Sequence, residues 1–150
     1  MPSLVDQFCP NTHDAPITAA STDPESGTVA TADQSGVVAI QRPGEAAAQL
    51  IFQPGQEEVR AINLIRGGAM VAVGDDTGTI GVYHTQDGQA VFQEVRDGAR
   101  GRVRAMRGVA LSPQGSTLAA IAKDGLLRVW DLSRNERNAW RGFSGSSVEF

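Results

Sequence analysis

One pattern recurs three times along the chain, and no other feature limits the possible folds so strongly. Gly36, Gly78 and Gly125 mark the three copies, with spacings of 42 and 47 residues. In every copy the second and fourth residues after the glycine are aliphatic, namely Val38 and Ile40, Ile80 and Val82, and Leu127 and Val129. Apolar residues at every second position predict a β-strand with one buried face. The chain is therefore expected to consist of repeated β units.

Each copy contains four strand-like stretches, separated by turns rich in Gly, Pro and Asp. The stretches of the first copy lie near 16–22, 27–32, 37–41 and 49–53. Those of the second copy lie near 59–65, 69–74, 79–84 and 90–95. Those of the third copy lie near 104–111, 117–122, 126–131 and 138–143. Four strands in a unit of about 42 residues is the spacing of a β-propeller blade, so we predict an all-β fold of three four-stranded antiparallel sheets.

The third copy carries the most specific signature. It reads Met106-x-x-Val109-x-Leu111-Ser112-Pro113-x-Gly115-x-x-Leu118-Ala119 and continues as Asp124-Gly125-x-x-Arg128-Val129-Trp130-Asp131. This pattern closely resembles the tryptophan–aspartate (WD) repeat family, and the resemblance extends over essentially the whole chain. The resemblance implies β-propeller blades at about 12–53, 55–95 and 102–143, and the start of a fourth repeat at 144–150.

The resemblance also implies structural roles for His13, Asp124 and Trp130. In the family, an Asp in the tight turn before the third strand of a blade joins a hydrogen-bond network with a His, a strand Ser or Thr, and the Trp. Asp124 matches this Asp, and by offset Asp33 and either Asp75 or Asp76 are its counterparts. No copy has the full set: Gln41 and Tyr83 replace the Trp, while Gly55 and Arg102 take the position of the His. The network is therefore expected to be incomplete.

A finished propeller needs more sheets than these three copies provide, because closed propellers typically have four to eight blades. An incomplete ring exposes strand edges and apolar faces, which favour association. Four explanations remain open: an N-terminal fragment of a longer propeller, one half of a split propeller completed by another chain, self-association of two copies, or a different compact arrangement of three blades.

Charge and cysteine content exclude several classes of function. The chain has 17 acidic and 13 basic residues, for a net charge of −4, so we expect neither nucleic acid nor an anionic membrane as a partner. One cysteine and two histidines are too few for a disulfide framework or a His/Cys metal centre, so no metal and no cofactor is predicted. No apolar run approaches the roughly 20 residues that cross a bilayer, and no signal-peptide pattern opens the chain, so the expected location is the cytoplasm.

Two groups of polar residues are candidates for binding. Five arginines fall within residues 96–107, and the docking candidates among them are Arg96, Arg100 and Arg102. Guanidinium groups bind carboxylates and phosphates bidentately, so this segment is either a docking loop for an acidic peptide, a phosphate or RNA, or a solvated loop that runs into a strand. The second group consists of acidic turn residues, namely Asp33, Asp75 and Asp76.

No combination of nucleophile, base and acid indicates catalysis, so no catalytic residue is predicted and the chain is not expected to be an enzyme. The resemblance implies a non-enzymatic scaffold for protein–protein interactions, with variable loops on a rigid frame. Two alternatives remain: a non-catalytic or channel-forming part of a propeller enzyme, and an arginine-loop reader of acidic peptide, phosphate or RNA. The expected partners are proteins, including a chain that supplies the remaining blades or a second copy of this chain.

Overall fold

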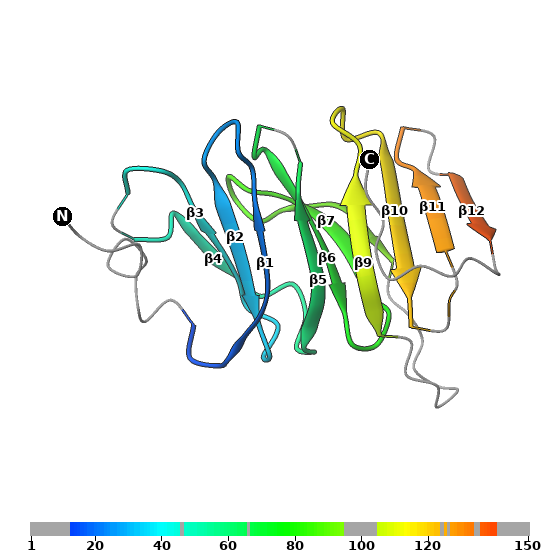
Figure 1. Cartoon of the computed structure of the whole chain (residues 1–150), viewed down its shortest axis with the longest axis horizontal. Helices are drawn as coiled ribbons and strands as arrows, with labels where there is room; N and C mark the ends of the chain where they lie inside the picture. Colours follow the sequence, from blue (N-terminus) through cyan, green and yellow to red (C-terminus); the bar gives the residue numbers. More distant parts are fainter. Residues whose placement is uncertain are drawn as a thin grey trace.

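The computed structural model describes residues 13–140, apart from 46, 66, 95–104, 124, 126, 134 and 135, and for 136–140 it describes the backbone alone. The described chain forms three four-stranded sheets (Figure 1). The first sheet consists of β1 (Ile17–Thr22), β2 (Val29–Asp33), β3 (Val38–Gln41) and β4 (Leu50–Phe52). The second consists of β5 (Val59–Leu64), β6 (Met70–Asp75), β7 (Ile80–His84) and β8 (Ala90–Glu94). The third consists of β9 (Met106–Leu111), β10 (Thr117–Ala122), β11 (Leu127–Asp131) and β12 (Glu136–Trp140).

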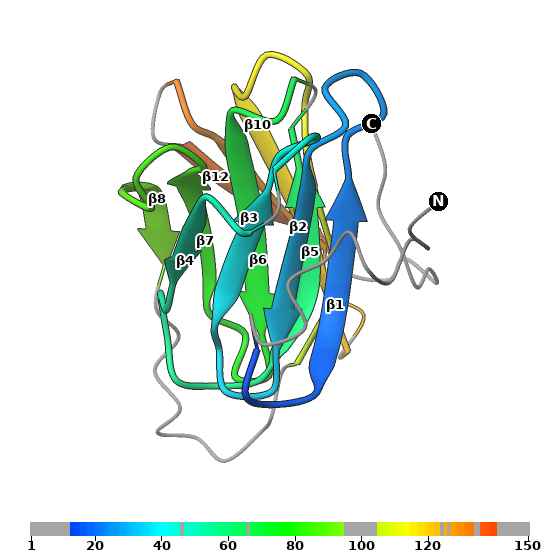
Figure 2. The same ribbon diagram turned by 90° about the vertical axis from the view of Figure 1, so that its left-hand side faces the viewer.

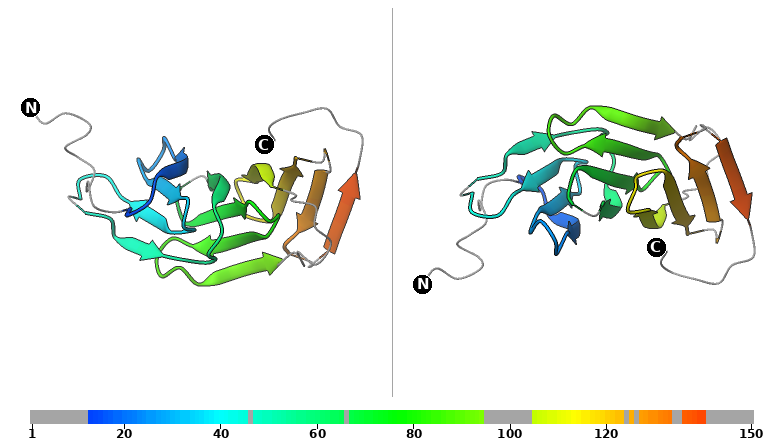
Figure 3. Two further views of the ribbon diagram at one scale, coloured as in Figure 1. Left: turned by 90° about the horizontal axis from the view of Figure 1, so that it is seen from below. Right: turned by 90° about the horizontal axis from the view of Figure 1, so that it is seen from above.

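Within each sheet, every strand pairs antiparallel with the next strand along the chain, which confirms the predicted all-β fold of three antiparallel sheets. The strands β1, β5 and β9 lie next to one another, and each sheet extends from there to its last strand (Figure 1). Figure 2 shows the first sheet with β1 at one edge and β4 at the other. The three sheets are stacked face to face, and over the described residues they do not close into a ring (Figure 3).

Two hydrophobic cores fill the spaces between the sheets. The core between the first and second sheets includes Val38, Val71 and Tyr83, whereas Ile80 and Val82 belong to the core between the second and third sheets. The strand β7 is therefore buried on both faces, and so are the consecutive residues of β3 from 38 to 40. The predicted single buried face was wrong for β7, because the second sheet stands between the other two and has no solvent face.

Side-chain hydrogen bonds join the first strand of each sheet to the first strand of the next. The Leu64 amide donates to Ser21 Oγ at 3.0 Å, and the Leu111 amide donates to Asn63 Oδ1 at 3.0 Å. Ser21 and Asn63 occupy equivalent positions of the repeat, 42 residues apart. These bonds satisfy strand amides at the point where one sheet meets the next.

The turn between β2 and β3 packs tightly against the connection from β4 to β5. Gly36 in this turn has a φ of +89°, and a Cβ built on it would lie 2.3 Å from the carbonyl oxygen of Gly55. Any other residue would meet both the steric cost of a positive φ and a clash with backbone. Gly36 therefore fixes how closely the first two sheets approach at this end.

We expect Gly36→Ala to destabilise the protein by more than about 2 kcal/mol, because backbone strain and the clash with Gly55 add up. Gly44→Ala is the matched control: Gly44 has a φ of +80°, but a Cβ there meets nothing within 4 Å. This control should lose only about 1 kcal/mol of stability, which is the cost of the positive φ. Urea denaturation of both variants measures the difference, and equal losses would contradict the argument.

The two faces of the third sheet predict different effects for two neighbouring apolar positions. Leu118 is fully buried opposite Trp130, in the core between the second and third sheets. Val129, one residue before Trp130, points to the other face of the sheet and is only half-buried. Leu118→Asp should destabilise the fold by more than about 4 kcal/mol, because it places an unpaired carboxylate in a core. Val129→Asp should cost clearly less in the same thermal melt, and the reverse order would show that the faces are wrongly assigned.

Candidate functional site

In the turn before the third strand of each sheet, one residue occupies the same structural position in all three sheets, and the backbone hydrogen bonds identify it. The amides of Gly36 and Gly78 donate to the carbonyls of Asp33 and Asp75 at 3.2 and 3.3 Å. The amide of Gly125 donates to the carbonyl of Ala122 at 3.0 Å. Ala122 therefore takes in the third sheet the place that the sequence pattern assigned to Asp124. Asp124 itself lies outside the described residues.

In the first sheet, this position is part of a buried polar network. His13 Nδ1 lies 2.8 Å from Asp33 Oδ2, and His13 Nε2 lies 2.7 Å from Thr31 Oγ1. A carboxylate can only accept, so Nδ1 is the donor to Asp33. The amides of Ser35 and Val37 donate to the other carboxylate oxygen at 2.8 and 3.1 Å. Three of the four expected network members thus meet here, although Gln41 stands in place of the Trp.

The Asp33 carboxylate holds the turn from the inside, because its side chain is only 1% exposed and both of its oxygens accept hydrogen bonds. Burial alone would raise the pKa of Asp33, but the hydrogen bond from His13 outweighs it, together with those from the Val37 and Ser35 amides. The charge of His13 adds to this effect, and the pKa of Asp33 falls below its ordinary value of 3.8.

The lowered pKa predicts a pH dependence of stability. A carboxyl with a lower pKa in the folded state stabilises the fold above its unfolded pKa, and this contribution is lost as the pH falls through the folded pKa. Asp33→Asn should therefore lose about 1–3 kcal/mol at neutral pH and show a shallower further loss below about pH 4. Chemical denaturation between neutral pH and about pH 2 measures both effects. Asp14→Asn is the control, because Asp14 is exposed; a parallel pH profile for Asp33→Asn and the wild type would refute the assignment.

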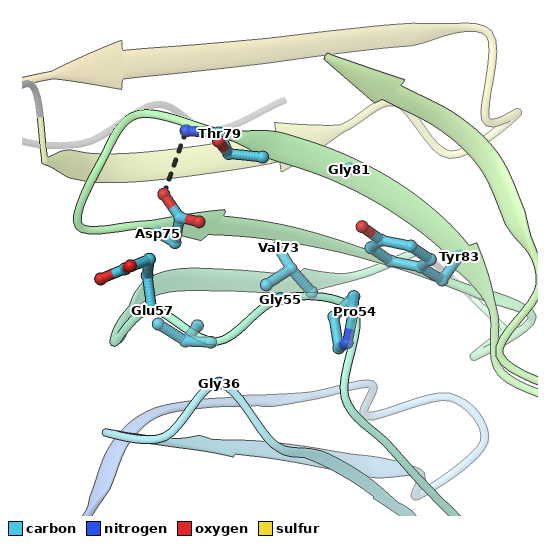
Figure 4. A pocket seen from close by; sticks show the side chains of 10 residues that line it. Gly36, Pro54, Gly55, Glu57, Val73, Asp75, Thr79, Gly81 and Tyr83 are labelled. Atoms are coloured by element: carbon cyan, nitrogen blue, oxygen red, sulfur yellow. Dashed lines mark hydrogen bonds between the residues drawn. The ribbon is translucent and has the colours of Figure 1, made fainter. Parts of the chain in front are cut away.

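In the second sheet, the same position faces a pocket instead of a histidine. Asp75 Oδ1 accepts hydrogen bonds from the Thr77 amide, the Thr77 hydroxyl and the Thr79 amide at 2.9, 2.7 and 3.0 Å. Gly55 stands where the first sheet has His13, so no side chain from that position approaches Asp75 Oδ2. A pocket of about 20 Å³ opens here between the first two sheets, lined among others by Gly55, Glu57, Val73, Asp75, Gly81 and Tyr83 (Figure 4).

Tyr83 forms the wall of this pocket opposite Asp75. Its side chain is buried, and a Cβ on Gly81 would lie 2.3 Å from its hydroxyl oxygen, so Gly81 provides the room that the hydroxyl occupies. Burial raises the pKa of Tyr83, and the negative charge of Asp75 raises it further, while a hydrogen bond with Gln93 opposes both. Figure 4 shows the Tyr83 hydroxyl and the Asp75 carboxylate on facing sides of the pocket.

The third sheet has neither of these arrangements. Ala120 and Ala122 stand where the first sheet has Thr31 and Asp33, and Arg128 pairs with Ala120 on the adjacent strand. Arg128 is 1% exposed, and its Nε, Nη1 and Nη2 atoms have no hydrogen-bond partner among the described residues. A buried guanidinium without partners is costly. Arg128 was not among the predicted site residues, although its position two residues before Trp130 places both on the same face of β11.

The remaining candidates do not join the pocket. Asp76 Oδ1 accepts from Arg60 Nε at 2.9 Å, and Arg60 Nη2 lies 3.0 Å from Glu58, so Asp76 belongs to an exposed ion-pair cluster. Trp130 is buried in the core, with its ring 5.9 Å from that of Phe92. The predicted docking arginines Arg96, Arg100 and Arg102 lie outside the described residues.

Two further kinds of feature are absent from the described part of the chain. No group of three or more His, Cys, Asp or Glu side chains there could hold a metal ion. None of the elements described there is a helix that is long and apolar enough to cross a membrane.

Comparison with known proteins identifies the fold. Residues 94–131 match the family model described as WD40, "WD domain, G-beta repeat". A solved structure titled "Crystal structure of RRP9 WD40 repeats" superposes with a TM-score of 0.76 at 17% identity, over 91% of this chain and 42% of that one. A second, "Structure of U3-55K", gives 0.75 at 16% identity, over 91% and 43%. A comparison with curated proteins found no match. The chain thus spans less than half the length of these two structures, and its three sheets correspond to their blades.

Proposed function

This chain consists of three WD40-type β-propeller blades, and we propose that it is a non-enzymatic scaffold that binds protein partners. The observation that carries the proposal is the architecture itself: the second sheet packs against the other two through two hydrophobic cores, and turns and a pocket lie at the surface of this frame. Binding residues are commonly placed on loops that a rigid scaffold positions. This step from fold to function is an analogy.

The chemistry of the described ionisable groups supports a binding role more than a catalytic one. The carboxylates with lowered pKa values, Asp23 and Asp33, both hold turns through hydrogen bonds to nearby amides. His13, which would be the natural general base, has both ring nitrogens engaged by Asp33 and Thr31. Nothing in these contacts presents a reactive group to a substrate.

We further propose that the three blades are part of a ring that another chain, a second copy or further repeats complete. The first blade supports this, because it presents an apolar residue to solvent. Ile51 pairs with Ala39 on the face that turns away from the second blade, and it is 54% exposed. Such a face is expected to be covered in a closed propeller. Four other expectations from the sequence stay proposals. They are a different compact arrangement of the three blades, a non-catalytic or channel-forming part of a propeller enzyme, a cytoplasmic location, and an arginine segment that reads acidic peptide, phosphate or RNA.

Light scattering coupled to size-exclusion chromatography tests whether the chain completes a ring by self-association. The monomer mass is 15.8 kDa, and we expect the purified chain to elute at twice this mass or more. Ile51→Glu should shift the population to the monomer, because a carboxylate on this face opposes apolar contact. Val91→Glu is the control, since Val91 is also exposed, at 42%, but lies on the second blade. A wild-type monomer at 15.8 kDa would refute completion by self-association.

A further inference from the structure

We propose that the pocket between the first two blades binds a primary ammonium group, supplied by a lysine side chain of a protein partner. The identity of the partner as a protein rests on the proposed scaffold function. The pocket and its chemistry are independent of that proposal, because they are properties of Gly55, Asp75, Tyr83 and their neighbours.

The first reason is a comparison between two equivalent places within this chain. In the first blade, Asp33 Oδ2 accepts a hydrogen bond from the imidazole of His13. In the second blade, Gly55 has no side chain, and Asp75 Oδ2 has no hydrogen-bond donor among the described residues. The oxygen instead faces the pocket (Figure 4). A donor that enters from outside would therefore take the place that His13 occupies one blade earlier.

The second reason is the fit of an ammonium group. A cavity of about 20 Å³ holds one group of the size of a water molecule, which is also the size of an ammonium group. Asp75 Oδ2 and the Tyr83 hydroxyl provide acceptors on two sides, and Glu57 lies at the edge of the pocket beside Asp75 (Figure 4). Val59 and Val73 offer an apolar surface to the methylene stem of a lysine.

Other ligands fit less well. A guanidinium is a planar group with five donors, which exceeds both the room and the acceptors of this pocket. A divalent cation such as Ca²⁺ requires six to eight oxygen ligands. An anion would meet Asp75 and Glu57 in a chain of net charge −4. Burial raises the pKa of Tyr83, and the negative charge of Asp75, which an ammonium group would neutralise, raises it further.

The test is an NMR titration of the ¹⁵N-labelled full chain with Nα-acetyl-lysine methylamide. We expect saturable shifts of the amide signals of Gly55, Thr79 and Tyr83. The norleucine analogue, which has the alkyl chain but no ammonium group, should leave these signals in place. Equal shifts with both compounds, or no shift with the lysine compound, would overturn the proposal.

Two variants with opposite expectations make the assignment specific. Asp75→Asn keeps the oxygen that accepts from Thr77 and Thr79 but removes the charge, and it should weaken binding at least about tenfold. Asp76→Asn is its matched control, because Asp76 contacts Arg60 outside the pocket, and it should bind as the wild type does. If Asp76→Asn weakened binding to the same extent, net charge alone would explain the effect of Asp75→Asn, and the proposed site would be wrong.

A third variant blocks the pocket without removing an acceptor. A Cβ on Gly55 meets nothing nearer than Asp75 Oδ2, at 3.9 Å, so Gly55→His can place an imidazole beside Asp75 as His13 lies beside Asp33. This variant should melt at or above the wild-type temperature and lose the lysine-dependent shifts. Retained binding in a folded Gly55→His protein would overturn the proposal. Because the probe is a small molecule, lysine binding by a chain that stays monomeric would support the pocket while refuting completion by self-association.

Discussion

Burial of a sheet on both faces is the constraint on which the rest of this structure depends. The second blade packs Ile80 and Val82 against the third blade and Tyr83 against the first. Between the stacked sheets, Ser21 and Asn63 each accept a hydrogen bond from an amide of the neighbouring blade, which offsets the cost of burying a polar side chain. At the equivalent position of the third blade stands Ala110, which offers no such acceptor. The repeat therefore varies its polar contacts while it keeps its apolar ones.

The same variation is seen at the turn position that Asp33, Asp75 and Ala122 share. The first blade closes a network around His13, the second leaves a pocket beside Gly55, and the third buries Arg128 next to Ala120. All three blades nevertheless form four strands. The histidine network is thus not needed for a blade to form, because apolar packing between sheets supplies most of the stabilisation. The turn position of the second blade does not form the histidine network, so it is available for another role such as ligand binding.

The sequence predicts the strands well and the site poorly, and the reason is physical. Alternating apolar residues and Gly, Pro or Asp turns act locally, so all twelve strands were predicted close to their observed bounds. The pocket depends on what Gly55 lacks and on how Gly55, Asp75 and Tyr83 meet across three segments, which no local pattern contains. The role predicted for Asp124 stays a prediction, because Asp124 lies outside the described residues. Ala122 lies three residues before the anchor glycine, as Asp33 and Asp75 do, and its carbonyl accepts the same backbone hydrogen bond.

The two oxygens of Asp75 divide the tasks of folding and binding. Oδ1 is fixed by Thr77 and Thr79, so the carboxylate keeps its orientation whether or not the pocket is filled. Gly36 packs closely against the carbonyl of Gly55, and both residues line the pocket. A ligand that reaches Oδ2 has no loop to order and no side chain to turn, and such preorganisation is what allows a small pocket to bind at a useful affinity. The pocket beside Gly55 and Asp75 is therefore better suited to an incoming cation than Asp76, whose partner Arg60 would have to be displaced first.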